Sequence, residues 1–139
     1  MKVTTELKTW RYIDNGGLFT VDVVHWVDKR PLKDMSPKPL EHHWNVYAYI
    51  CPGHPLFERI ESEDFCDGLL PLHGGVSYHK WFYDSTGAVI YKKIGSDYQH
   101  LFDERFAGYS TEDEAWEVFK DAEELIQFME NREIIVEEK

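Results

Sequence analysis

The first half of the chain alternates apolar and polar residues with the two-residue period of β-strands. Residues 7–13 place Trp10 and Tyr12 at alternate positions, and residues 18–27 are rich in β-branched and aromatic side chains. The segment Asp14-Asn15-Gly16-Gly17 between them favours a tight turn, because asparagine and glycine tolerate positive φ angles. The pattern predicts a β-hairpin.

Three further runs, 44–50, 76–83 and 88–94, have the composition of strands. Between the last two, Asp84-Ser85-Thr86-Gly87 predicts a second hairpin turn. Residues 28–43 contain three prolines among charged residues, and proline lacks the amide donor that a strand or helix needs. We therefore expect a loop there, long enough to act as a lid, and an irregular acidic connection over residues 56–72.

The clearest predicted element is a helix near the C-terminal end. Thr111 and Glu114 have the spacing of a capping box, in which each side chain accepts from the other's backbone amide. Apolar residues then recur at helical spacing: Ala115, Val118, Phe119, Ala122, Leu125, Ile126 and Met129. This pattern predicts an amphipathic helix from about Glu112 to Asn131 that packs on a sheet, with docking into a partner's groove as the alternative.

Together these elements predict an α+β fold, a mostly antiparallel β-sheet with one C-terminal amphipathic helix packed on a face. The length of 139 residues suits a single domain, 1–139. Residues 1–43 would supply the N-terminal hairpin and proline-rich loop, and residues 44–131 the core that carries the motifs. The apolar content of 42% is that of a globular protein.

The charge narrows the range of partners. With 26 acidic and 15 basic side chains, the chain has a net charge of −11, which argues against direct binding of DNA or RNA. The same acidity could let the chain mimic nucleic acid and occupy a basic groove of another protein. Two cysteines are too few for a secreted disulfide framework. No apolar run has the length of a membrane helix, so we expect no membrane association and a cytoplasmic location.

Candidate chemistry begins at His73-Gly74-Gly75. Adjacent glycines let the backbone approach a ligand closely, and their amides can face an anion. His73 would then stand beside a concavity, with Tyr78 a few residues along the next strand. The alternative is a plain glycine turn with a structural histidine.

Asp97, His100 and Asp103 follow one another at intervals of three residues. In a helical turn they would project from one face. An aspartate beside a histidine raises the basicity of the imidazole, as a general base or a metal ligand requires. We therefore take His100, Asp97 and His73 as candidate catalytic residues. The alternative is a solvated turn in which Asp97 caps a short helix.

His54 is held between Pro52-Gly53 and Pro55 at a strand end, where a structural role and a ligand-binding role both stay open. Cys51 and His54, with Cys66 and His73 downstream, could also hold zinc, although the second half of that spacing is unusual. The sequence does not identify a metal or a cofactor.

These motifs resemble a family of small uncharacterised bacteriophage and prophage proteins. The resemblance lies in Gly53 to Leu56, in His73 to Tyr78, and in Gly95, Asp97, His100 and Asp103, and it covers about residues 44–129. Ser96 stands where that pattern has an aromatic residue. The resemblance implies a phage origin, a location in the host cytoplasm and a shared site, but it supplies no activity.

The candidate ligand-binding residues are His54, His73, Gly74, Gly75, Tyr78, Asp97, His100 and Asp103, which we expect at one edge of the sheet. The leading hypothesis is a phage-encoded protein that sequesters a small nucleotide-like host metabolite or signal to counter host defence. The second is a hydrolase with a His/Asp site, with or without a metal. The third is an acidic protein inhibitor of a host nucleic-acid-binding protein. A homo-oligomer or a host protein partner is compatible with each.

Overall fold

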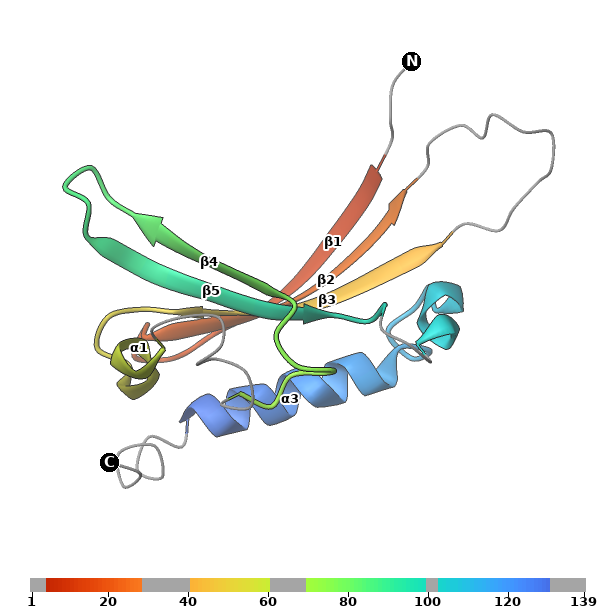
Figure 1. Ribbon diagram of the computed structural model, residues 1–139. Helices are drawn as coiled ribbons and strands as arrows, with labels where there is room; N and C mark the ends of the chain where they lie inside the picture. The colour runs from red at the N-terminus through yellow and green to blue at the C-terminus, as the bar shows by residue number, and fades with distance from the viewer. Residues whose placement is uncertain (1–4, 29–40, 61–69, 100–102, 131–139) are drawn as a thin grey trace, which may run out of the picture.

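The computed structural model describes residues 5–28, 41–60, 70–99 and 103–130. Its elements are β1 (Thr5–Ile13), β2 (Phe19–Asp28), β3 (His42–Ile50), α1 (Pro55–Arg59), β4 (Tyr78–Tyr83), β5 (Val89–Asp97), the short 3-10 helix η1 (Glu104–Gly108) and α3 (Trp116–Glu130). Figure 1 shows one twisted sheet with α3 beneath it. The predicted α+β fold, an antiparallel sheet with a C-terminal helix, is confirmed.

The five strands lie in the order β1-β2-β3-β5-β4, and each neighbouring pair is antiparallel. Strand β5 therefore returns between β3 and the edge strand β4. Residues directly opposite one another on paired strands share a face of the sheet, and successive residues alternate between faces. Tyr47, Gly95 and Tyr78 stand in one cross-strand row, and Ala48 and Ile94 stand in the next row, on the other face.

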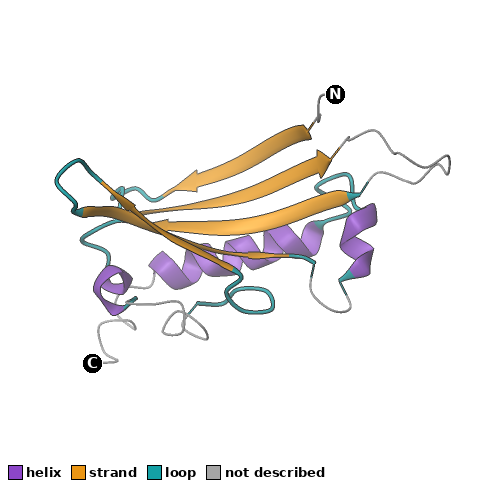
Figure 2. Cartoon of the chain, turned by 45° about the horizontal axis from the view of Figure 1, so that its top comes forward, coloured by secondary structure: helices purple, strands orange, loops and turns teal. Residues whose placement is uncertain are grey.

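Figure 2 shows α3 lying along one face of the sheet, and most of the buried core residues come from that face and from the helix. Every second residue of β3 is buried there, namely Trp44, Val46, Ala48 and Ile50. The helix contributes Val118, Ala122, Leu125 and Met129, which recur at intervals of three and four residues. Burying one large apolar side chain contributes about 1.5–3 kcal/mol, so this layer fixes which face of the sheet is covered. The opposite face carries none of the described helices (Figures 1 and 2).

The helix begins later than the sequence predicts. Residues 112–115 form turns, and α3 proper starts at Trp116. Half of the predicted capping box is present, because Oγ1 of Thr111 accepts from the amide of Glu114 over 3.2 Å. The Glu114 carboxylate accepts from the amide of Ser110, one residue earlier than predicted, over 3.0 Å. Because Ser110 donates this bond in place of Thr111, the reciprocal pair of backbone bonds of a capping box is incomplete.

The loop predicted over residues 28–43 is too long at both ends, and Asp28 is the last residue of β2. His42 and His43 belong to β3 and extend its ladder with β2. The His43 ring stacks on Trp26 of β2 with centroids 4.0 Å apart, and this packing stabilises the strand end. Residues 29–40, where we expect a lid, lie outside the described residues.

Two other segments differ from their predictions by more than two residues. Residues 55–59 form α1, where the sequence predicted an irregular connection, because Pro55 suits a first helical position and His54 caps the helix. Strand β5 continues to Asp97, past its predicted end at Ile94, because β3 offers it ladder partners up to Asn45. Within the described ranges, no helix combines the length and the apolar character that crossing a membrane requires.

Candidate functional site

The structure brings together His73 and Asp103, two of the predicted site residues. Nε2 of His73 lies 2.8 Å from Oδ2 of Asp103, which is buried next to η1. His73 sits in a tight turn in which the amide of Gly75 donates to the carbonyl of Leu72. Gly74 has a φ of 68°, so this turn needs a residue that adopts positive φ without strain.

A buried tyrosine holds this pair against the helix layer. The His73 ring stacks on Tyr98 with centroids 4.3 Å apart. The Tyr98 hydroxyl donates to Oδ2 of Asp121 on α3 over 2.7 Å. Burial, together with the hydrogen bond to Asp121, raises the pKa of Tyr98 above its ordinary value. The pair of His73 and Asp103 has the chemistry of an oriented general base, and its contacts also anchor the glycine turn.

His54 has a structural role, which corrects its prediction as a ligand-binding residue. Its side chain is 2% exposed. Nδ1 accepts from the amide of Leu56 at the start of α1 over 3.1 Å. An amide nitrogen only donates, so Nε2 carries the proton and donates to the carbonyl of Met129 over 2.8 Å. Both ring nitrogens therefore serve to join α1 to the end of α3.

The zinc hypothesis fails at the same residue, because neither nitrogen of His54 is available to a metal. Cys66, another of the proposed zinc ligands, lies outside the described residues. Across the described ranges, no three His, Cys, Asp or Glu side chains are grouped closely enough to hold a metal ion.

Tyr78 and Asp97 lie on the sheet face opposite α3. Tyr78 pairs with Gly95, and Asp97 is two residues further along β5, so both side chains point to that face. Oδ1 of Asp97 accepts from the amide of Gln99 over 3.1 Å. Asp97 is the last residue of strand β5. It is therefore not part of a helical turn, and the prediction that such a turn aligns it with His100 and Asp103 is wrong for Asp97. His100 lies outside the described residues.

The predicted site is thus divided between two faces of the sheet. His73 and Asp103 lie on the α3 side, whereas Tyr78 and Asp97 belong to the opposite face. On that face we define a tyrosine–lysine face, which comprises Tyr47, Tyr49, Tyr78, Lys80, Phe82, Tyr91 and Lys93 from β3, β4 and β5. Its rings form two groups of contacts. Tyr78 contacts Tyr47, and Tyr91 contacts both Tyr49 and Phe82.

Lys93 is at the centre of the tyrosine–lysine face. Its ammonium group lies 4.2 Å from the ring centre of Tyr47, 5.0 Å from that of Tyr49 and 5.2 Å from that of Tyr78. Burial lowers the pKa of Lys93, but the hydrogen bond with Tyr49 and the neighbouring tyrosines outweigh it, and the pKa is raised on balance. Burial raises the pKa of Tyr47. At neutral pH this face therefore presents a fixed positive charge among uncharged rings.

Gly95 allows the tyrosine rings to reach the backbone. A Cβ atom at this position would lie 2.3 Å from Cδ1 of Tyr47 and 2.6 Å from the carbonyl oxygen of Val46. Tyr47 therefore lies directly over the β5 main chain, and its ring meets that of Tyr78 edge to face. Lys93 and Tyr47 belong to none of the motifs that the sequence predicts for the site. The alternate tyrosines in the run 44–50 are the signal that could have identified this face.

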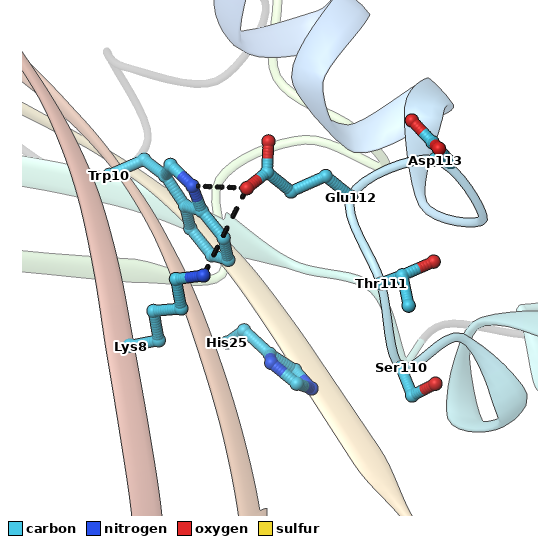
Figure 3. Close-up of a pocket in the computed structure, with 7 residues that line it drawn as sticks. All are labelled: Lys8, Trp10, His25, Ser110, Thr111, Glu112 and Asp113. Carbon is cyan, nitrogen blue, oxygen red and sulfur yellow. Dashed lines mark hydrogen bonds and ion pairs between the residues drawn. The ribbon is translucent and has the colours of Figure 1, made fainter.

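A pocket of about 370 Å³ lies between the first half of β1 and the segment that precedes α3. We call it the Lys8 pocket; it is lined by Lys8, Trp10, His25, Ser110, Thr111, Glu112 and Asp113. Figure 3 shows Lys8 and Trp10 converging on the Glu112 carboxylate. The indole of Trp10 donates to Oε1 of Glu112 over 2.8 Å.

Stacked rings form the inner wall of the Lys8 pocket. Trp10 stacks on Trp44, which stacks in turn on His25 with centroids 4.3 Å apart. His25 also shares a hydrogen bond of 2.9 Å with His42. Trp10 and His25, which line the pocket, are thus each packed against a ring of β3.

Comparison with known proteins gives no relative for this chain. No family model matches its sequence, and neither the curated proteins nor the solved structures yield a match.

Proposed function

We propose that this chain is a binding protein which holds a small nucleotide-like molecule on the tyrosine–lysine face. The observation that carries the proposal is the position of the Lys93 ammonium group among three tyrosine rings. Aromatic rings stack with nucleobases of any sequence, and a stacked base contributes about 1–3 kcal/mol. A lysine in the same place offers a point charge to a phosphate group.

The remaining groups of the face suit the same ligand. Lys80 is exposed on β4, directly opposite Lys93, and brings a second ammonium group to the face. Asp97 adds a carboxylate, which accepts hydrogen bonds from ribose hydroxyls or base amino groups. The net charge of −11 opposes an anion at long range, but physiological salt screens charges beyond about 8 Å. Local contacts with the two lysines therefore decide the affinity.

The resemblance to phage proteins extends the proposal to a biological role. A phage protein that sequesters a nucleotide signal in the host cytoplasm would lower its free concentration and blunt a host defence that depends on it. Sequestration requires binding without turnover, and a stacking surface with a fixed cation provides binding without a chemical step.

The test is an ultrafiltration assay with a panel of nucleoside mono-, di- and triphosphates and cyclic mono- and dinucleotides. The protein is incubated with the panel, filtered, heat-denatured and filtered again. A nucleotide that disappears from the first filtrate and returns intact in the second supports sequestration. A panel that passes through unchanged contradicts the proposal.

A hydrolase is the second candidate, favoured by the contact between His73 and Asp103. An imidazole that is oriented by a carboxylate can remove a proton from water, with His73 as the base and Asp103 as its orienting partner. In the same assay a nucleotide would return chemically altered. His73→Ala should then abolish the alteration, whereas Lys93→Ala, on the opposite face, should leave the chemical step intact.

A further inference from the structure

We propose that the Lys8 pocket receives a lysine or arginine side chain of a basic polypeptide. This inference concerns a different surface from the tyrosine–lysine face and does not depend on the nucleotide proposal. It gives a structural basis to the interaction with a basic protein that the acidity of the chain suggests.

The first support is that an ammonium group of the chain itself occupies the pocket. Nζ of Lys8 lies 4.7 Å from the centre of the Trp10 ring and 4.0 Å from Oε1 of Glu112. An aromatic ring face and a carboxylate together make the environment that a cation prefers. The pocket therefore already holds the kind of group that we propose as its ligand.

The second support is that Lys8 is held weakly. The Lys8 side chain is 65% exposed and that of Glu112 is 54% exposed, and their separation is at the outer limit of an ion pair. Such surface pairs contribute little to stability. An incoming ammonium or guanidinium group can thus displace Lys8 at small cost and take its place over Trp10. The Trp10 indole N–H donates to the same oxygen, Oε1, and keeps Glu112 in position.

The third support is the shape and charge of the surroundings. A second hollow shares Lys8, His25 and Ser110 with the pocket and continues to Leu7, which is 68% exposed. The pocket and this second hollow together form an open surface that a side chain of a polypeptide can enter. At low ionic strength the chain's net charge of −11 would steer a basic polypeptide toward it.

The test follows the Trp10 indole N–H signal by nuclear magnetic resonance in isotope-labelled protein, at constant salt. Trp10→Phe identifies the signal. Tetralysine is the probe, tetraglutamate is the negative control, and spermidine distinguishes a small polyamine from a peptide. We expect tetralysine to shift the signal in a saturable manner, tetraglutamate to leave it unchanged, and spermidine to bind more weakly than tetralysine.

Two variants give opposite expected effects. Lys8→Gln removes the internal occupant and should tighten tetralysine binding about threefold. Glu112→Gln removes the carboxylate and should weaken binding about tenfold. Lys120→Gln is the matched control, because it makes the same charge change on the exposed side of α3 and should leave the affinity close to that of the wild type.

The proposal is overturned if tetralysine does not shift the Trp10 signal in the wild type. It is also overturned if Lys120→Gln tightens binding as much as Lys8→Gln, since the attraction would then be due to total charge. Spermidine binding as tightly as tetralysine would contradict a polypeptide ligand. The wild-type titration does not depend on how any variant folds.

Discussion

The ammonium group of Lys93 lies 4.2 Å from the centre of the Tyr47 ring, on the sheet face opposite α3. This relationship requires two neighbouring strands, β3 and β5, in one register. Tyr47 comes from β3, Lys93 from β5, and the ring extends over Gly95, which offers no side chain. The nucleotide proposal depends on this arrangement, so its structural basis can be tested separately from binding.

Gly95→Ala should destabilise the protein. The added Cβ would lie 2.3 Å from Tyr47 and 2.6 Å from the Val46 carbonyl oxygen, and forcing an atom into such a space costs about 1–3 kcal/mol. Urea unfolding measures the loss. Gly108→Ala is the control, because nothing lies within 4 Å of its Cβ position. Equal stability of Gly95→Ala and the wild type would show that Tyr47 does not lie over β5.

His54→Leu should destabilise the protein by about 2–4 kcal/mol, because it leaves a buried amide and a buried carbonyl without their partners. These groups belong to Leu56 and Met129. Urea unfolding measures this loss, with His79→Leu as a control at an exposed histidine of β4. Nucleotide retention by the folded fraction should be unchanged. A stable His54→Leu variant that loses ligand binding would restore the sequence prediction for this residue.

Stability should fall in alkali, and Tyr98 should account for part of the fall. The pKa of Tyr98 is raised from 10.0 in the folded state, first by burial and then by its bond to Asp121. Above about pH 10 the unfolded chain loses this proton while the folded chain keeps it, so the free energy of unfolding decreases as pH rises. Tyr47, whose pKa burial also raises, adds to the same trend.

The measurement is urea unfolding of the wild type and of Tyr98→Phe at about pH 8, about pH 10 and about pH 11. The variant should be less stable by about 1 kcal/mol at about pH 8, because it lacks the hydroxyl donor to Asp121. It should then lose less stability than the wild type as pH rises. Parallel pH profiles for the two proteins would exclude Tyr98 as the source of the dependence.

The sequence predicts those parts of the fold that depend on local patterns. The hairpin of β1 and β2 follows from alternation and a glycine-rich turn, and α3 follows from apolar residues at helical spacing. The start of α3 was less predictable, because Ser110 competes with Thr111 for the Glu114 carboxylate. The choice between such neighbouring partners depends on geometry that residue spacing does not specify.

The division of the site between two faces could not be predicted in the same way. It depends on β3 pairing with β5, which places Tyr47 opposite Gly95 and carries Asp97 to the far side from α3. His73 and Asp103 are 30 positions apart, and they meet where the His73 ring packs against Tyr98 and against Phe106 of η1. Residue types indicated the chemistry, whereas strand order and register determined which residues meet.

The most direct test of the central claim is nucleotide retention by three proteins: the wild type, Lys93→Ala and Lys120→Ala. Both variants remove one positive charge, but only Lys93 lies on the tyrosine–lysine face. If the wild type retains a nucleotide of the panel, we expect Lys93→Ala to raise its Kd about tenfold, the usual effect of losing one charge-assisted bond. Lys120→Ala should bind as the wild type does. Equal retention by all three proteins, or by none, would contradict the account.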